Sequence, residues 1–348
     1  MKRFISLLLS LLILISISAV SASAGLVETR TYYYKDFSYY YHKNEKEIVI
    51  SSYIGTASKV TIPSEINGCK VAALGDCDTE EGFVSGGFSK NKYIEEVKIP
   101  DTVEYVGQFC FNECYNLKKV KLGKNVKEIG IWAFLDCKSL KSINIPEAIT
   151  DFDSQPFAGT NITKIRLTQN IKSADLLWLN LKAITVSKEN KFFTAKDGVL
   201  YNKKKSSLVY YPNAKNKKTF KIPNKVQNIK KWAFDNTTKL KKVVLPKNLK
   251  LIESSAFCST NISKIKFTGK KKVTLQKYAL WECKKLKSVT VPKNVIKIGK
   301  QALGFYTTND ENNHKAIDHK MKSFTIKGKK NSAAHKYAKK YKIRFVAV

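Results

Sequence analysis

The chain has 348 residues, and its 63 Lys and Arg against 28 Asp and Glu give a formal net charge of +35 at pH 7. A charge of this size favours anionic partners such as nucleic acid, acidic polysaccharides, anionic wall polymers and anionic membranes. A lysine-rich surface that serves only solubility is the competing interpretation. After residue 24 no run approaches the ~18 apolar residues that a membrane-spanning helix needs, so we predict no transmembrane segment in the mature chain.

The first 24 residues have the pattern of a secretory signal peptide. Lys2 and Arg3 form a basic head, residues 4–20 are apolar apart from serines, and residues 22–24 form a small-residue cleavage site. We therefore expect a secreted, extracellular protein, with a retained membrane anchor as the alternative. Association with a cell surface is expected to be non-covalent, because no anchoring segment is recognisable at the other end of the chain.

Residues 25–58 are predicted to form an N-terminal β cap. They contain two runs of three tyrosines, residues 32–34 and 39–41, followed by the apolar run 48–50, and such runs are typical of short strands. A solenoid needs a cover on its first coil, because an open end leaves core exposed. An aromatic sugar-binding platform built from the tyrosines is the alternative to stacking within a sheet.

Residues 59–187 and 216–327 are predicted to be leucine-rich repeats. The unit at residues 120–140 holds a short strand, a turn, an apolar pair ending at Gly130, and a tight turn around one bulky residue, Phe134, which we call the plug. A fixed period of this length is typical of a leucine-rich-repeat solenoid, and the alternation within each strand predicts a parallel sheet on one face. The plugs recur every 23 residues in two series: Phe88, Phe111, Phe134 and Phe157, then Phe234, Phe257, Leu280 and Leu303.

Two further segments complete the predicted β-rich solenoid. Residues 188–215 carry the hairpin signal Asp197-Gly198, so we expect a small β-hairpin or meander insertion that buds from the solenoid. Residues 328–348 are expected to form a C-terminal helix-strand cap, with Ser332 as the helix N-cap. The acidic insert at residues 76–85 is interpreted as a solvated loop, because its spacing does not fit a calcium-binding loop.

The seven cysteines are interpreted mainly as core thiols. Three of them follow a plug by three residues and share their column with threonines, which marks a small, semi-buried packing position. An odd number of cysteines cannot pair completely within one chain, and Cys69 with Cys77 is the pair that we would test for a disulfide. The column consists of Cys114, Cys137 and Cys283 together with Thr160, Thr237 and Thr260.

No motif in the sequence points to catalysis. The four histidines lie in predicted caps or loops, and the sequence contains no HExxH helix, no CxxC pair and no His cluster. It also lacks a glycine-rich phosphate loop and a GxSxG motif. We therefore predict that the chain is not an enzyme and that it has no catalytic residue, no metal site and no cofactor.

The repeat string resembles the BspA-like family of bacterial surface leucine-rich-repeat proteins. The resemblance covers residues 47–348, and segments 197–202 and 332–348 also look like recurring pieces of that family. It implies a secreted or surface-exposed binding protein, often credited with adhesion to host matrix or neighbouring cells. It carries no fixed functional residues, and residues 168–218 depart from its pattern because they lack clean plugs. The residues that carry it are Ile129-Gly130, Ala133-Phe134, 137–140 and Ile145-Pro146.

Stacked coils place the outward residues of successive strands in rows, about 4.8 Å apart. In the two rows that the strand pattern predicts, nine of the twenty positions are cationic and only Glu96 is acidic. Neighbouring charges lie within a Debye length of about 8 Å, so their potentials add. We take nine residues as candidate ligand-binding positions on a basic sheet face: Lys98, Lys119, Lys121, Lys164, Arg166, Lys221, Lys242, Lys264 and Lys266.

Three functions remain open at this point. The first is adhesion or ligand recognition, in which the basic face binds a host or neighbouring-cell surface protein or an acidic glycan. The second is a non-catalytic cell-envelope protein held by charge on an anionic wall polymer, which salt extraction from intact cells would distinguish from the first. The third is an extracellular nucleic-acid binder, which the rows disfavour because they lack aromatic residues for base stacking. The oligomeric state is left undetermined.

Overall fold

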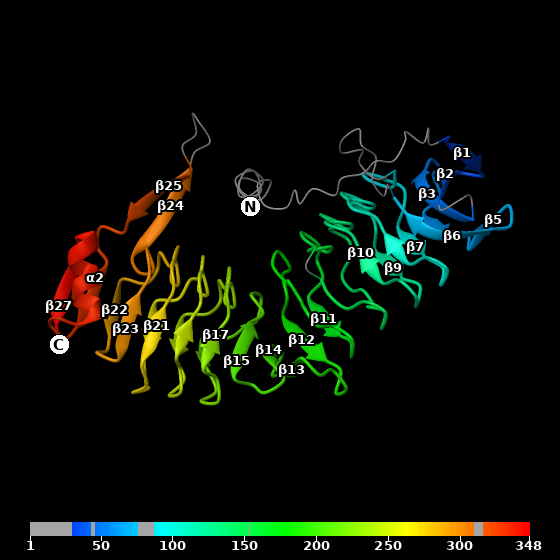
Figure 1. Cartoon of the computed structure of the whole chain (residues 1–348). Helices are drawn as coiled ribbons and strands as arrows, with labels where there is room; N and C mark the ends of the chain where they lie inside the picture. Colours follow the sequence, from blue (N-terminus) through cyan, green and yellow to red (C-terminus); the bar gives the residue numbers. More distant parts are fainter. Residues whose placement is uncertain (1–29, 43–45, 76–86, 153, 310–315) are drawn as a thin grey trace, which may run out of the picture.

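The computed structural model describes residues 30–42, 46–75, 87–152, 154–309 and 316–348. Its coils follow one another along an arc, from strands β1–β3 at one end to helix α2 and strand β27 at the other (Figure 1). The predicted signal peptide and the predicted acidic loop lie outside these ranges.

Each regular coil contributes strands to two parallel ladders, which we call ladder A and ladder B. This arrangement confirms the predicted leucine-rich-repeat solenoid and adds a ladder, because Glu128–Ile129, directly before Gly130, is itself a strand. Ladder A contains β4 (Lys59–Thr61), β7 (Glu96–Lys98), β9 (Lys119–Lys121), β11 (Lys164–Leu167), β12 (Ala183–Val186), β16 (Thr219–Lys221), β18 (Lys242–Val244), β20 (Lys264–Lys266), β22 (Ser288–Val291), β26 (Thr325–Gly328) and β27 (Arg344–Ala347). Ladder B contains β6 (Cys69–Leu74), β8 (Tyr105–Val106), β10 (Glu128–Ile129), β17 (Asn228–Ile229), β19 (Leu251–Ile252), β21 (Val273–Leu275) and β23 (Val295–Ile298).

A three-stranded antiparallel meander begins each of the two ladder B series. In the first half, the last strand of the meander pairs in parallel with β6, and in the second half it pairs in parallel with β17. The N-terminal cap and the insertion in the middle of the chain are therefore two copies of the same structural arrangement. Their strands are β1 (Tyr32–Tyr34), β2 (Phe37–His42) and β3 (Glu47–Tyr53), and β13 (Phe193–Lys196), β14 (Val199–Asn202) and β15 (Ser207–Tyr210).

The second meander does not bud from the solenoid, as the sequence suggested, but lies between two hydrophobic cores. Leu200 and Tyr210 pack into the core of the first half. Val199, Tyr201 and Leu208 pack into the core of the second half. Successive strand residues point to opposite faces, so strands with apolar residues on both faces can separate and join the two cores.

The plugs form a continuous buried column within each half. Phe111 and Phe134 stack with ring centroids 5.2 Å apart and planes at 3°, and Phe234 and Phe257 stack at 4.5 Å and 12°. Each column is covered at its start by a tyrosine that the plug series did not include. Tyr53 stacks on Phe88 at 6.3 Å, and Tyr211, which lies inside the predicted insertion, stacks on Phe234 at 5.1 Å.

Polar side chains join neighbouring coils at fixed positions. Asparagine amides donate to carbonyl oxygens of the preceding coil, as from Asn125 to Asp101 at 2.8 Å and from Asn248 to Asn224 at 2.9 Å. The predicted thiol column is buried, and the Cys114 thiol donates to the Phe88 carbonyl at 2.9 Å. Burial raises the pKa of Cys114 to about 12, so this thiol is inert at neutral pH. Of the pair proposed for a disulfide, Cys77 lies outside the described residues.

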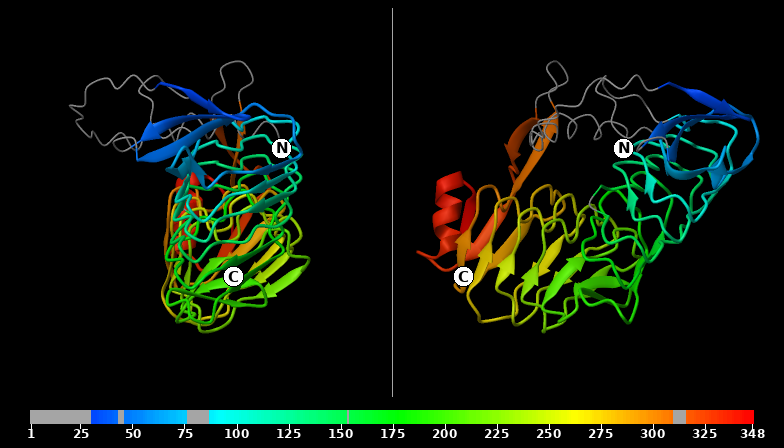
Figure 2. Two further views of the ribbon diagram at one scale, coloured as in Figure 1. Left: turned by 90° about the vertical axis from the view of Figure 1, so that its right-hand side faces the viewer. Right: turned by 45° about the vertical axis from the view of Figure 1, so that its right-hand side comes forward.

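The C-terminal end combines a hairpin, a helix and a last strand. Helix α2 (Ala333–Tyr341) begins at Ser332, whose side chain accepts a hydrogen bond from the His335 amide, and it buries Ala334, Tyr337 and Ala338. Figure 2 shows the hairpin formed by β24 (Phe305–Asn309) and β25 (Ala316–Lys320) projecting from the stacked coils. In the first half, β5 (Glu65–Ile66) forms a small hairpin with β6.

We expect Phe134→Ala to lower the free energy of unfolding by about 3–5 kcal/mol, because the plug is fully buried between two others. Phe134→Leu should cost less than about 1.5 kcal/mol, since leucine fills the same position at 280 and 303. Urea unfolding followed by circular dichroism measures both. An equal loss for the two variants would show that ring stacking, and not buried volume, stabilises the column.

Candidate functional site

The nine candidate residues all lie on strands of ladder A, in three separate groups. Lys98, Lys119 and Lys121 belong to the sheet β4-β7-β9, Lys164 and Arg166 to the pair β11-β12, and the other four to the sheet β16-β18-β20. Eight are exposed and Lys242 is half-buried, while the strand residues between them point into the core. The remaining four are Lys221, Lys242, Lys264 and Lys266.

Two interruptions divide the row that the sequence predicted as continuous. Residues 142–146 form no strand, so β9 and β11 do not belong to one sheet. After β12 the next position is taken by the meander, whose Gly198 carbonyl accepts a hydrogen bond from the Ile184 amide at 3.0 Å. Strand β26 also shifts the expected rows by two residues, because Lys327, and not Thr325, lies opposite Thr290.

In the first group one of the three cations, Lys119, is paired with a carboxylate on the same face, and further ion pairs lie beside the sheet. Glu96 lies between Lys59 and Lys119 in the sheet, and its carboxylate is 3.8 Å from the Lys119 ammonium. Beside the sheet, Lys118 contacts Glu95 at 2.8 Å, and Lys124 contacts Asp101 at 3.3 Å. Exposed pairs of this kind contribute little stability, but they cancel much of the local positive potential. The positive potential over the first group is therefore reduced.

In the third group the cations are not matched. Lys242 lies directly opposite Lys264 on the neighbouring strand, and no exposed position of β16, β18 or β20 carries a carboxylate. The surrounding sequence has the same bias, since residues 201–309 contain 27 lysines and three acidic residues. The net charge of the whole chain hides this segregation, whereas the charge counted segment by segment along the sequence shows it.

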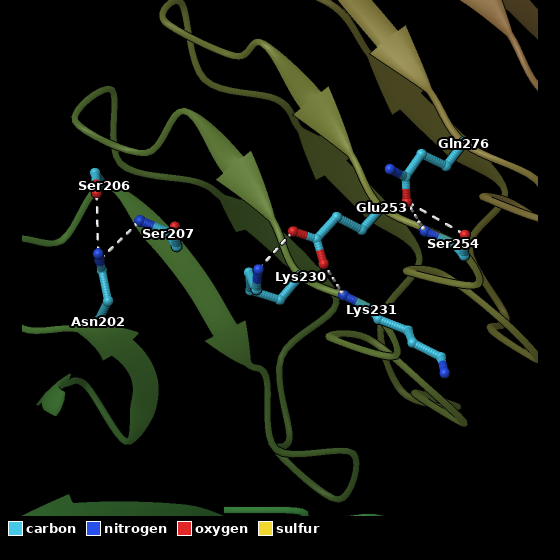
Figure 3. A network of polar contacts seen from close by, with 8 residues as sticks. All are labelled: Asn202, Ser206, Ser207, Lys230, Lys231, Glu253, Ser254 and Gln276. Atoms are coloured by element: carbon cyan, nitrogen blue, oxygen red, sulfur yellow. Dashed lines mark hydrogen bonds and ion pairs between the residues drawn. The ribbon is translucent and has the colours of Figure 1, made fainter. Parts of the chain in front are cut away.

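All three of those acidic residues are used within the fold. Glu253 contacts the Lys230 ammonium at 2.6 Å and accepts the Lys231 amide at 3.0 Å, as Figure 3 shows. Glu282 is buried and contacts Lys284 at 2.8 Å. Burial raises the pKa of Asp235 to about 7, so this carboxyl is largely neutral in mildly acidic solution. None of them is available to neutralise the lysines of ladder A.

Other polar clusters do not form a catalytic arrangement. A shallow groove of about 330 Å³ lies over the start of ladder B, but Glu104 at its edge is held by Lys70 and Lys127, which lower its pKa to about 2. A second cavity, lined by Asp175, measures only about 10 Å³, which is barely room for one water. The charge of Asp175 also adds to the rise in the pKa of Asp235. Within the described ranges, no three His, Cys, Asp or Glu side chains group in a way that could hold a metal.

Replacing Lys242 by Glu should stabilise the fold by about 0.2–1 kcal/mol, because an opposite charge then faces Lys264 across the strands. The matched change Lys119→Glu should destabilise it by a similar amount, since it puts a carboxylate beside Glu96. Urea midpoints at low and at high salt measure both effects, and both should shrink at high salt. If both substitutions stabilised the fold, or both destabilised it, the difference in charge between the first and third groups would be contradicted.

The stability of the chain should fall as pH rises from about 4 to about 7, because folded Asp235 retains a proton that the unfolded chain has already lost. The Asp235→Asn variant should lack this dependence and be more stable than the unmodified chain at pH 8. The rise from 3.8 to about 7 limits the difference to about 4 kcal/mol. Urea unfolding of both proteins at pH 5 and pH 8 measures it; parallel pH profiles would show that Asp235 titrates normally.

The comparisons with known proteins agree with this geometry. The crystal structure of the pneumococcal vaccine antigen PcpA matches over 92% of this chain and 99% of that chain, with 17% identity and a TM-score of 0.58. A leucine-rich-repeat protein from Eubacterium ventriosum matches with 19% identity, 92% of this chain, 85% of that chain and a TM-score of 0.59. A leucine-rich cell surface protein from Faecalibacterium prausnitzii matches with 23% identity, 88% and 89% coverage and a TM-score of 0.50.

At these identities the structural matches establish the fold alone. No curated protein matches the chain. Among the residues that the structure describes, no helix has the length and apolar character that crossing a bilayer requires. The model of the BspA type leucine-rich repeat region matches residues 82–196 and 207–324 in six copies. With most of its length matched, the chain belongs to the BspA type leucine-rich repeat family.

Proposed function

We propose that this chain is a secreted or cell-surface binding protein that recognises an acidic polymer, such as an acidic glycan of a host or neighbouring cell, through the lysines of ladder A. The third group, Lys221, Lys242, Lys264 and Lys266, forms the centre of the site. The first two groups, with Lys98, Lys119, Lys121, Lys164 and Arg166, contribute less.

One observation carries this proposal: four cations share the exposed face of one three-stranded sheet without any carboxylate on that face. Strands in one sheet are about 4.8 Å apart, so the positive potentials reinforce one another. Repulsion between these lysines opposes folding, and a bound polyanion relieves it. The rigid backbone of the sheet holds the cations at a regular spacing, which suits a ligand with repeated negative charges.

Family and sequence support the proposed location. The signal-peptide pattern of residues 1–24 favours secretion. Proteins with BspA type repeats are typically found at the cell surface or outside the cell, and one structural match is described as a cell surface protein. An anionic wall polymer offers the same chemistry as an acidic glycan, so a role in the cell's own envelope is the second source of ligand to test. Repeat proteins of this kind bind partners on extended surfaces, and catalysis has no support in the geometry.

The test is a triple reversal, Lys242→Glu, Lys264→Glu and Lys266→Glu, measured for heparin binding at several salt concentrations. Affinity should fall at least about tenfold, or ~1.4 kcal/mol, and the salt dependence should weaken because fewer counterions are released. The control reverses three exposed lysines outside ladder A, Lys172, Lys191 and Lys204, and gives the same net charge. Equal losses in both variants would mean that only net charge matters.

The same variants distinguish the sources of the polymer. If high salt releases the protein from the cells that secrete it and the triple reversal abolishes retention, the ligand is a polymer of the cell's own wall. If the protein is not retained there but binds immobilised sulfated or sialylated glycans, the ligand belongs to another cell. Absence of binding to every polyanion tested would refute the proposal.

A further inference from the structure

A second row of side chains follows a different edge of the solenoid, where each coil leaves ladder B and enters the plug turn. The residue two positions before the plug is aromatic in four coils. Phe109 and Trp132 occupy it in the first half, with ring centroids 5.5 Å apart, and Trp232 and Tyr278 occupy it in the second half. All four side chains are partly exposed.

The backbone at this position is left-handed in every such coil, with φ of 60° at Trp232 and Tyr278. Glycine, asparagine and aspartate adopt this conformation at the lowest energy, and bulky residues rarely do. The other left-handed position of the plug turn, two residues after the plug, carries aspartate, glycine or asparagine in three coils and lysine, glutamate or serine in the other four. Its residues are Lys90, Glu113, Asp136, Gly159, Asn236, Ser259 and Glu282. None of these seven residues is aromatic, so the left-handed backbone of this turn does not by itself select an aromatic ring, and the turn geometry leaves the aromatic row unexplained.

In the second half, exposed lysines accompany the aromatic rings. Three of the residues just before the row are exposed lysines: Lys231, Lys277 and Lys300. The Lys231 ammonium lies 5.9 Å from the centroid of the Trp232 ring. The Glu253 carboxylate pairs with the Lys230 ammonium and accepts the Lys231 amide, so its ion pair is made with Lys230 and not with the Lys231 side chain. Figure 3 shows the Lys231 side chain extending away from Glu253.

Rigid contacts hold this edge in place. The Tyr278 amide donates to the Lys300 carbonyl of the next coil at 2.9 Å, and the Ser255 amide donates to the Lys277 carbonyl at 3.3 Å. Gln276 accepts hydrogen bonds from Ser254 with its amide oxygen, and Figure 3 shows its amide nitrogen directed away from that contact. Aromatic faces, cations and an amide donor thus stand in fixed register along the solenoid axis.

We infer that this edge, formed by Lys231, Trp232, Lys277, Tyr278 and Lys300, binds a chain of an acidic polysaccharide. The apolar faces of sugar rings stack on Trp232 and Tyr278, and the acidic groups lie against the three lysines. Two coils separate the aromatic residues, or about 10 Å along the axis, and alternate sugars of an extended chain present equivalent faces at a similar interval. The inference rests on the proposed function for the acidic character of the ligand. It adds that the ligand has sugar rings that stack, and that a second surface besides ladder A binds it.

Single-stranded nucleic acid is the competing ligand, because it also combines stacking with negative charge. The first half argues against it. There the aromatic row continues through Phe109 and Trp132, but the residues before them are Gln108 and Ile131, without a cation. A polysaccharide can use such uncharged aromatic positions, whereas nucleic acid carries a phosphate at every unit.

The experiment compares Trp232→Asn/Tyr278→Asn with the unmodified full chain for binding of heparin, polyphosphate and single-stranded DNA. Asparagine removes the ring and suits the left-handed backbone, so the variant should fold, and its urea midpoint verifies this. We expect affinity for heparin to fall about tenfold, with affinity for polyphosphate unchanged, because polyphosphate has no ring to stack. Phe192→Asn, at an exposed aromatic residue outside the row, is the control.

A second measurement uses Lys231→Ala/Lys277→Ala, at exposed positions that do not contribute to the core. This variant should bind heparin more weakly, and its binding of a neutral polysaccharide such as dextran should equal that of the unmodified chain. Unchanged heparin affinity in both variants would overturn the inference and leave the proposed site on ladder A intact. Loss of DNA binding without loss of heparin binding would also overturn it, in favour of nucleic acid. If no polyanion binds the unmodified chain, the proposed function itself fails.

Discussion

The structure depends on the burial of each coil against the next. A single coil of this chain has two short strands and one plug, too little to enclose a core, so its apolar residues are buried only by its neighbours. The column of plug residues shows the consequence, since Phe111 stacks on Phe134 and Phe234 on Phe257. A column of this kind must be covered at each end. Tyr53 and Tyr211 cover the two starts, and helix α2 covers the last coils.

The same stacking turns isolated surface residues into rows. A residue that faces solvent in one coil stands beside its equivalent in the next, so the chemistry of the surface is set by columns of residues. In the first half, Glu96 and its neighbours place carboxylates among the lysines. In the second half, Lys242 faces Lys264, and the few acidic residues are engaged elsewhere. Two halves with the same backbone therefore present different electrostatic surfaces, and only the second is strongly cationic.

In the plug turn, the required backbone conformation can be separated from the type of side chain that occupies each position. Both left-handed positions of the turn are required by its geometry, and the position after the plug is filled in seven coils by residues of which none is aromatic. At the other position the chain uses Trp132, Trp232 and Tyr278, which the geometry does not favour. Residues that the backbone conformation of their position does not favour are candidates for a role in binding.

The sequence by itself determined the repeat, the plug column, the core thiols, the family and the strands that carry the nine candidate cations, because period and alternation are local properties of the chain. It did not reveal ladder B, since the two-residue strand Glu128–Ile129 is too short to show alternation. It also could not divide the row of cations. That division depends on Gly198 reaching Ile184 and on which strands pair, and hydrogen bonds between residues distant in the chain decide both. The placement of the second meander between two cores is likewise tertiary, because only neighbours in space decide which face of a strand each core covers.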